Sequence, residues 1–139
     1  MLMRRHKMRL LLMLAAFSCF ALLGWKSATG QKQVKITGTY SDMYYNKEGG
    51  DVLGTEIKIV FGAGSYQGTL QIAEGEPSGL VVVQVKAEGN KIAFSIPDDN
   101  PYAGQFEGIV SAESLQGEFR FKGGGSEKVK LRRGESYWD

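Results

Sequence analysis

The sequence predicts an all-β fold, a single antiparallel up-and-down meander of about eight strands closed as a small barrel. After residue 31, apolar and polar residues alternate with period two in short runs, and no segment sustains a helical period over three turns. Most runs are joined by short turns rich in glycine and asparagine, which is typical of hairpins. Closure is expected because an open sheet would leave two edges free to pair.

The expected strands follow one another along the chain, with apolar residues at alternate positions. One run is almost wholly apolar, so both of its faces are expected to be covered. The apolar positions of the eight runs are Val34, Ile36 and Tyr40; Ile57, Ile59 and Phe61; Tyr66, Leu70 and Ile72; Leu80 to Val85, the apolar run; Ile92, Phe94 and Ile96; Phe106 and Val110; Leu115, Phe119 and Phe121; and Val129 and Leu131.

Two polar stretches interrupt this alternation. Residues 41–54 are too long and polar for a hairpin turn, and residues 97–103 contain two prolines and two aspartates. Long loops in small domains often carry function, so we expect 41–54 to form a lid over one end of the barrel. The alternative is a surface loop, or a short extra strand at 43–45.

Three glycines fall on inward-facing positions of the expected strands, beside aromatic residues. Gly108 and Gly117 each lie two positions from a phenylalanine, Phe106 and Phe119, and Gly68 lies two positions from a tyrosine. A glycine at such a position leaves room for a ring across the pleat, which predicts a packed core. The alternative is that the missing side chains leave a cavity.

The first 30 residues have the pattern of a secretory signal peptide, and residues 31–139 form the expected barrel domain. A basic start precedes an apolar run over 10–25, and Ala28 and Gly30 are the small residues that a cleavage site requires. Cleavage after Gly30 would export the protein to the periplasm or the extracellular space. Two alternatives stay open, namely that the run is retained as an anchor or that Cys19 is lipidated.

Cleavage would remove the one histidine, His6, and the one cysteine, Cys19. Thiol nucleophiles, imidazole bases and the usual nitrogen and sulfur metal ligands would then be missing, so we expect neither an enzyme nor a cofactor nor a bound metal. The leader contains five basic and no acidic residues, which leaves 12 basic and 15 acidic residues, a net charge of −3. This charge argues against a nucleic-acid partner.

Carboxylates suggest two further kinds of site. Glu107 and Glu118 could form a glycosidase-type acid pair, but their positions alternate with Phe106 and Phe119, so they are expected to face solvent. Oxygen ligands for calcium recur in both polar stretches, although turns require the same residue types. These residues are Asp42, Asn46, Glu48 and Asp51 in the first stretch and Asp98, Asp99 and Asn100 in the second.

The chain ends in two large rings, Tyr137 and Trp138. A tail that frays would expose both rings to water, so we expect them to dock on the barrel as a plug. The alternative is a contact with a partner protein.

The first and last expected strands carry a pattern that resembles the calycin group, the lipocalins and avidins. Gly38-Thr39-Tyr40 stands in the first strand and Arg132-Arg133 ends the last. In that group a Gly-x-Trp on the first strand is covered by a cation from the end of the barrel. The resemblance implies a small barrel in which Tyr40 takes the place of the tryptophan and Arg132 or Arg133 that of the cation.

The function we expect is binding without catalysis. Four tyrosines lie in or beside the long loops, and they would form the wall of a barrel-mouth site for a small apolar or aromatic ligand. They are Tyr44, Tyr45, Tyr66 and Tyr102. The alternative is an interaction module or inhibitor that presents its loops to another exported protein. The identity of the ligand or partner and the oligomeric state are not encoded in these patterns.

Overall fold

The computed structural model describes residues 33–139, and the predicted leader lies outside this range. The described residues form nine antiparallel strands and no helix, and eight of the strands close into a barrel, which confirms the predicted fold class. The strands are β1 (Gly38–Ser41), β2 (Tyr44–Asn46), β3 (Asp51–Gly62), β4 (Ser65–Gly75), β5 (Val81–Glu88), β6 (Lys91–Ile96), β7 (Gly104–Val110), β8 (Ser114–Phe121) and β9 (Ser126–Gly134).

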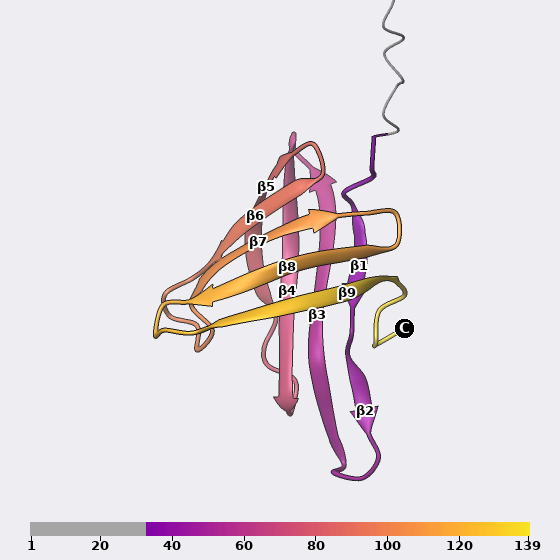
Figure 1. Ribbon diagram of the computed structural model, residues 1–139, viewed down its shortest axis with the longest axis vertical. Helices are drawn as coiled ribbons and strands as arrows, with labels where there is room; N and C mark the ends of the chain where they lie inside the picture. The colour runs from indigo at the N-terminus through magenta and orange to yellow at the C-terminus, as the bar shows by residue number, and fades with distance from the viewer. Residues whose placement is uncertain (1–32) are drawn as a thin grey trace, which may run out of the picture. The chain divides into compact units, whose positions relative to one another are not determined.

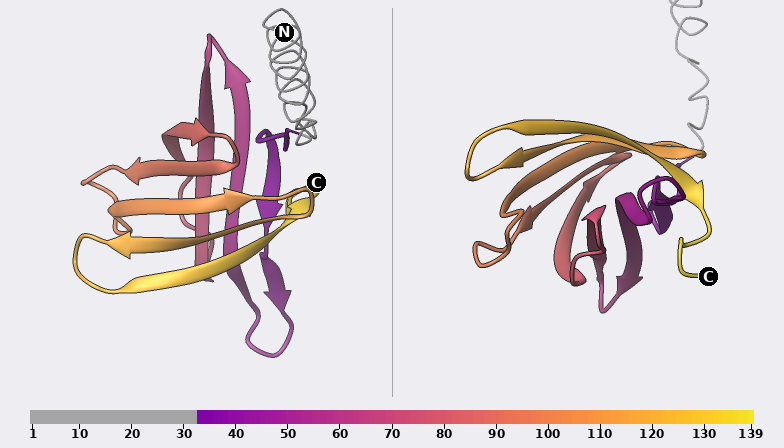
Figure 2. Two further views of the ribbon diagram at one scale, coloured as in Figure 1. Left: turned by 45° about the horizontal axis from the view of Figure 1, so that its top comes forward. Right: turned by 90° about the horizontal axis from the view of Figure 1, so that it is seen from below.

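The barrel closes because β1 pairs on both sides. Tyr40 is the register partner of Ile57 on β3 and of Arg133 on β9, and each of the other barrel strands pairs with its neighbours in the chain. Strands β7 to β9 cross β3 and β4 steeply, and the strands follow one another around the wall when the barrel is seen from below (Figures 1 and 2). Such steep crossing is typical of small closed sheets, whose strands must tilt and twist.

The barrel interior is filled by aromatic side chains. The ring of Phe106 lies 4.6 Å from that of Phe119 and 4.9 Å from that of Phe94, between ring centroids, and all three are buried. Gly117 and Gly108 border the Phe106 ring, and a Cβ on Gly108 would come within 2.9 Å of it. The expectation of ring packing is confirmed, because Phe106 occupies the space that these glycines leave.

The expectation of a long loop over 41–54 is wrong. β2 and the start of β3 pair through Tyr44 with Leu53 and Tyr45 with Val52, so only a turn over 47–50 lies between them. The extra strand that was the alternative is present, at 44–46. The resulting β2–β3 hairpin projects beyond the barrel wall (Figure 1).

The barrel wall has a seam at β5. Its first part pairs with β4 through residues 81–85, and its last part pairs with β6 through residues 86–88. Ala93 and Ser95 on β6 therefore line a hollow of about 360 Å³ on the outer side of the wall. Val82 is 70% exposed, which corrects the expectation that both faces of the apolar run are covered.

No helix within residues 33–139 has the length and the apolar character that a membrane crossing requires.

Candidate functional site

The most distinctive site is the end of the barrel where β4, β6 and β8 finish, which we call the mouth. Inward-facing positions near this end are occupied by Leu53 on β3, Glu74 on β4, Phe121 on β8 and Glu127 on β9. Each of them lies an even number of residues from the buried core positions of its strand. Their side chains therefore point toward the barrel axis at the end of the wall. The strands thus aim two carboxylates and a ring at the same opening.

Tyr102 lies across this opening. Its hydroxyl donates a 3.0 Å hydrogen bond to Oε2 of Glu74, and its ring lies 6.5 Å from that of Phe121, between centroids. β4 and β8 are four strands apart in either direction around the eight-strand ring, so they face each other. Tyr102 therefore connects opposite sides of the mouth.

Tight turns in the β6–β7 loop hold Tyr102 in place. The backbone N–H of Tyr102 donates to Oδ1 of Asn100, at 2.9 Å, and that of Ala103 donates to the Asn100 carbonyl, at 3.0 Å. The N–H of Lys122 in turn donates to the Ala103 carbonyl, at 2.8 Å, which ties the loop to the end of β8. Asparagine and proline are the residues that such turns favour.

The electrostatics of the mouth are negative. Burial raises the pKa of the Tyr102 hydroxyl, and the hydrogen bond to Glu74 and the charges of Glu74 and Glu127 raise that pKa further. The lone lysine of the site, Lys122, is paired at 2.8 Å with Asp98. A positive group entering the mouth would therefore meet two carboxylates that have no cationic partner among the described ion pairs.

A hollow of about 540 Å³ lies beside Tyr102, with walls from β4, the β6–β7 loop and the β8–β9 turn. Its aromatic floor is Tyr102 and Phe121, both half-buried, and Glu74 and Glu127 stand exposed at its rim. The opposite side of the hollow is lined by Gly123 and Gly124 of the β8–β9 turn, which have no side chains. This volume suits a small molecule or one large side chain.

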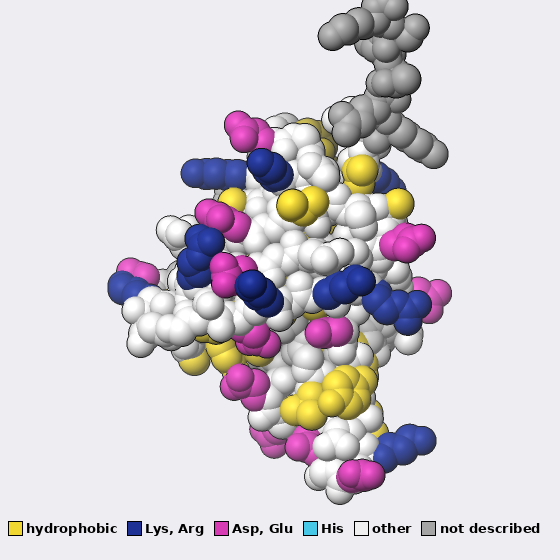
Figure 3. Space-filling model, viewed as in Figure 1, with side chains coloured by type: hydrophobic (Ala, Val, Ile, Leu, Met, Phe, Trp, Pro, Cys, Tyr) yellow, Lys and Arg dark blue, Asp and Glu magenta, His cyan; other side chains and the backbone are white. Residues whose placement is uncertain are grey.

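Acidic residues are concentrated around this end of the barrel. The segments 42–51, 74–76, 98–99 and 122–127 hold eight acidic and two basic residues, a net charge of −6. Residues 33–139 together have 15 acidic and 11 basic residues, so the rest of the barrel is slightly positive. Acidic side chains outnumber basic ones around the lower part of the molecule in Figure 3. The barrel thus has a marked charge asymmetry.

The four tyrosines proposed from the sequence do not form one wall. Tyr44 and Tyr45 lie on the β2–β3 hairpin at the mouth end, 54% and 53% exposed. Tyr66 lies at the far end of β4, where its ring packs at 4.8 Å against that of Phe61. Only Tyr102 lines the hollow at the mouth.

The pair that the calycin resemblance implies lies at the opposite end. Arg133 is placed over Tyr40, with its guanidinium carbon 4.7 Å from the ring centroid, whereas Arg132 is exposed on the outer face. The Arg133 guanidinium also donates to the carbonyls of Thr37, at 2.9 Å, of Lys35, and of Ser111, at 3.2 Å. This end is therefore closed by structural contacts.

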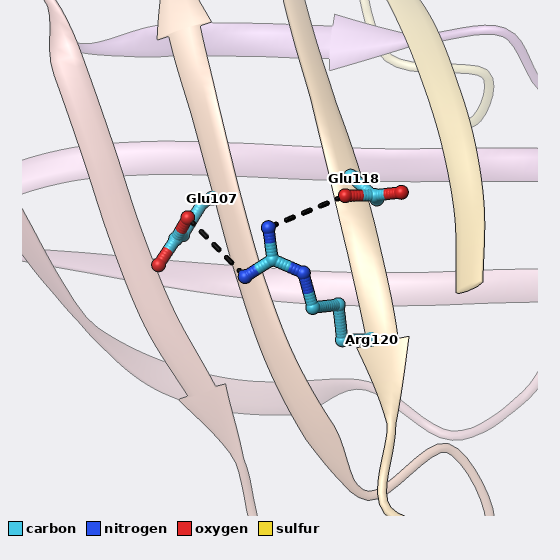
Figure 4. A network of polar contacts seen from close by, with 3 residues as sticks. All are labelled: Glu107, Glu118 and Arg120. Atoms are coloured by element: carbon cyan, nitrogen blue, oxygen red, sulfur yellow. Dashed lines mark hydrogen bonds and ion pairs between the residues drawn. The ribbon is translucent and has the colours of Figure 1, made fainter. Parts of the chain in front are cut away.

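The outer face of β5 to β9 forms a shallow hollow of about 990 Å³ with charges of both signs. Glu107 and Glu118 are cross-strand partners there, as expected on the solvent side, and Arg120 lies 3.4 Å from the first and 3.3 Å from the second (Figure 4). The side chains of Glu107 and Arg120 are more than half exposed. Exposed ion pairs of this kind add little stability, and the two carboxylates share the one guanidinium of Arg120.

Some of the oxygen ligands considered for calcium are used in local structure. Oδ1 of Asp42 accepts the Thr55 N–H at 2.7 Å, and Oδ1 of Asn46 accepts the Glu48 N–H at 3.2 Å. Within residues 33–139, histidine, cysteine, aspartate and glutamate side chains form no cluster of three that could hold a metal ion.

The C-terminal rings dock on the outer wall instead of plugging the mouth. Glu56 accepts hydrogen bonds from the Ser136 hydroxyl, at 2.6 Å, and from the Tyr137 N–H, at 2.8 Å. Trp138 donates its indole N–H to Gln71, the register partner of Glu56, at 2.8 Å. The tail is therefore a strap across β3 and β4.

Glu74, Phe121 and Glu127 were not selected as site residues by sequence reasoning. The sequence signal that could have identified them is their parity, since each continues the inward positions of its strand to the strand end that borders a turn or loop. Their convergence depends on the closure of the barrel, which no local pattern reveals.

Comparison of the chain with protein-family models, with curated proteins and with solved structures finds no match.

Proposed function

We propose that this protein is a non-enzymatic binding module whose mouth takes a cationic group carried on an apolar body, such as an arylalkyl amine or a guanidinium. The observation that carries the proposal is the aromatic surface of Tyr102 and Phe121 between the carboxylates of Glu74 and Glu127. A binding role at the mouth agrees with the expectation from the sequence, and the acidic surroundings define the ligand more narrowly as a cation.

Each group has a defined role in this proposal. A cation over the face of Tyr102 gains about 0.5–2 kcal/mol from the ring, depending on how far it is desolvated. Glu74 and Glu127 add charge-assisted hydrogen bonds to its N–H groups. Phe121 offers an apolar surface to the body of the ligand. The acidic loops around the mouth raise the local concentration of cations and speed their arrival.

The test is titration of the purified chain with phenethylamine, followed by calorimetry and by NMR of the backbone amides. Binding with shifts centred on Tyr102 and Phe121 is expected, together with at least a tenfold loss of affinity in Glu74→Gln/Glu127→Gln. Glu76→Gln is the matched control, because Glu76 is an acidic residue of the same region that does not line the hollow. Phenylpropionate, which has the opposite charge, should not bind.

A negative result is equally clear. Equal binding of the amine and the carboxylate, or shifts centred away from the mouth, would contradict the proposal.

We also propose that the chain is exported, as the leader predicts. Mass spectrometry of the secreted or periplasmic fraction should find a mature chain that begins at Gln31. A chain that begins at Cys19, or one that keeps residues 1–30 in the membrane fraction, would instead support lipidation or anchoring.

A further inference from the structure

The β2–β3 hairpin offers a second and separate surface. β2 is the last strand of the sheet order, and among the described residues it pairs with β3 alone, so its other edge is open. An open edge presents backbone donors and acceptors in the spacing that another strand requires. Natural proteins usually protect such edges, so an open edge at a projecting hairpin calls for an explanation.

A break at Asp42 and Met43 separates β2 from β1, although both strands pair with β3 in the same register. Asp42 interrupts the strand between β1 and β2, with its N–H donating to the Thr55 carbonyl at 3.1 Å and its carboxylate accepting the Thr55 N–H at 2.7 Å. Gly54 permits this close approach because it has no side chain. A Cβ at this position would lie 2.7 Å from the Asp42 carbonyl oxygen and 2.8 Å from the Met43 Cα, and the φ of Gly54, +112°, also favours glycine. β9 pairs with β1 only as far as Ser41, so no described strand lies beside the outer edge of β2.

Tyr45 is the centre of this edge. The Asn46 carbonyl is directed into the hairpin, where it accepts the Gly50 N–H at 2.8 Å. Because successive residues of a strand direct their backbone groups to opposite sides, the N–H and C=O of Tyr45 point outward. The rings of Tyr44 and Tyr45 stand on opposite faces of the hairpin and are both about half exposed. Side chains of this kind are enriched in protein interfaces.

The charge around the edge identifies the kind of partner. The segment 42–54 contains three acidic residues, Asp42, Glu48 and Asp51, and one basic residue, Lys47. Glu74 lies on the neighbouring strand β4, and Glu76 follows that strand. Acidic and apolar side chains gather over this part of the molecule in Figure 3. Pairing of two copies through β2 would bring like charges together, which disfavours a second copy of this chain as the occupant.

We propose that the open edge of β2 binds an extended, basic segment of another protein, which adds a strand beside Tyr45. The partner's backbone would pair with the N–H and C=O of Tyr45, and its lysine or arginine side chains would lie over the rings of Tyr44 and Tyr45. This inference does not depend on ligand binding at the mouth, since it concerns different residues and a different mode of recognition.

The experiment uses a short peptide of alternating lysine and valine, added to the purified chain and followed by NMR of the backbone amides. The largest shifts are expected at Tyr44 to Asn46, with at least a fivefold loss of affinity in Tyr45→Ala. Val60→Ala is the matched control, because Val60 is a half-exposed apolar residue of β3 near its other end. The same peptide with alternate backbone nitrogens methylated should bind with at least tenfold lower affinity, because it keeps its charge but cannot pair as a strand.

Three outcomes would overturn the inference. Unchanged binding of the methylated peptide would show attraction by charge alone. Shifts centred on Tyr102 and Phe121 would place the peptide in the mouth. Sedimentation showing a dimer that Tyr45→Ala dissociates would make a second copy the occupant of this edge.

Discussion

The guanidinium of Arg133 covers the ring of Tyr40 at 4.7 Å, and it binds backbone carbonyls from two segments that meet at the closed end of the barrel. One of these segments, 35–37, precedes β1, and the other contains Ser111, after β7. Tyr40 contributes a hydrogen bond of its own, from its hydroxyl to the Ile36 carbonyl at 2.6 Å. The two side chains thus tie the start of the barrel domain to its last strand.

Arg133→Ala should therefore lower the free energy of unfolding by about 2–4 kcal/mol, because it removes the cation over the ring and leaves partly buried carbonyls without a donor. Arg132→Ala is the control, since Arg132 is the next residue on β9 and is exposed; it should cost less than about 0.5 kcal/mol. Urea unfolding of both variants measures the difference. Equal effects would show that the contact with Tyr40 does not stabilise the fold.

Gly117→Ala should destabilise the core by about 1–3 kcal/mol, because the added methyl would overlap the ring of Phe106 and the Glu107 carbonyl. Gly123→Ala is the matched control, since a Cβ there would have no neighbour within 4 Å. Thermal unfolding of the two variants should differ by several degrees. Phe106→Leu should lower the free energy of unfolding less when it is made in the Gly117→Ala variant than when it is made in the parent chain, because the smaller side chain relieves the overlap with the added methyl.

The sequence was sufficient to predict the barrel because alternation and turn chemistry are local signals. Phe94, Phe106 and Phe119 stand at positions of the same parity on successive strands, and their packing follows once those strands pair in register. The prediction of a loop over 41–54 was wrong because tyrosine, asparagine and glycine there suited a loop as well as a strand. The strand β2 is defined by its pairing with the start of β3, Tyr44 with Leu53 and Tyr45 with Val52, which residue type alone does not reveal.

The candidate site was less predictable than the fold. Tyr66 was grouped with Tyr44 because both are near turns, but these turns close opposite ends of β3. Glu74 and Tyr102 are 28 residues apart and touch only because β4 and the β6–β7 loop meet across the mouth. Convergence of this kind is a property of topology, so composition and spacing do not reveal it.

Removal of residues 136–139 should lower stability by about 1–3 kcal/mol, because Glu56, which is 8% exposed, would lose both of its hydrogen-bond donors. Glu56→Gln with the tail intact should have a smaller effect, since the amide oxygen can still accept one bond. Trp138 is the one tryptophan in residues 33–139, so its fluorescence reports on the strap directly. Undocking under native conditions, seen as a red shift without loss of β structure, would contradict a structural role for the tail.

Glu74→Gln should lower the pKa of Tyr102 toward the ordinary value of 10.0 without reaching it. Burial is the largest cause of the raised pKa and remains in the variant, whereas the negative charge of Glu74 is removed. When the pKa of a hydroxyl is higher in the folded state than in the unfolded state, its contribution to stability is fully present at pH values below the pKa of the unfolded state. This contribution is lost as the pH rises through the pKa of the folded state. The parent chain should therefore lose stability above about pH 10, and Glu74→Gln should lose less over the same window.

The measurement is an NMR titration of the Tyr102 ring, with urea unfolding at each pH. Burial also raises the pKa of Tyr40, so stability alone would mix the two tyrosines, and only the difference between the parent and Glu74→Gln isolates the mouth. Glu76→Gln is the control, because Glu76 is not among the groups that shift Tyr102. If both variants leave the titration of Tyr102 unchanged, the hydroxyl does not engage Glu74 in solution and the mouth is open on that side.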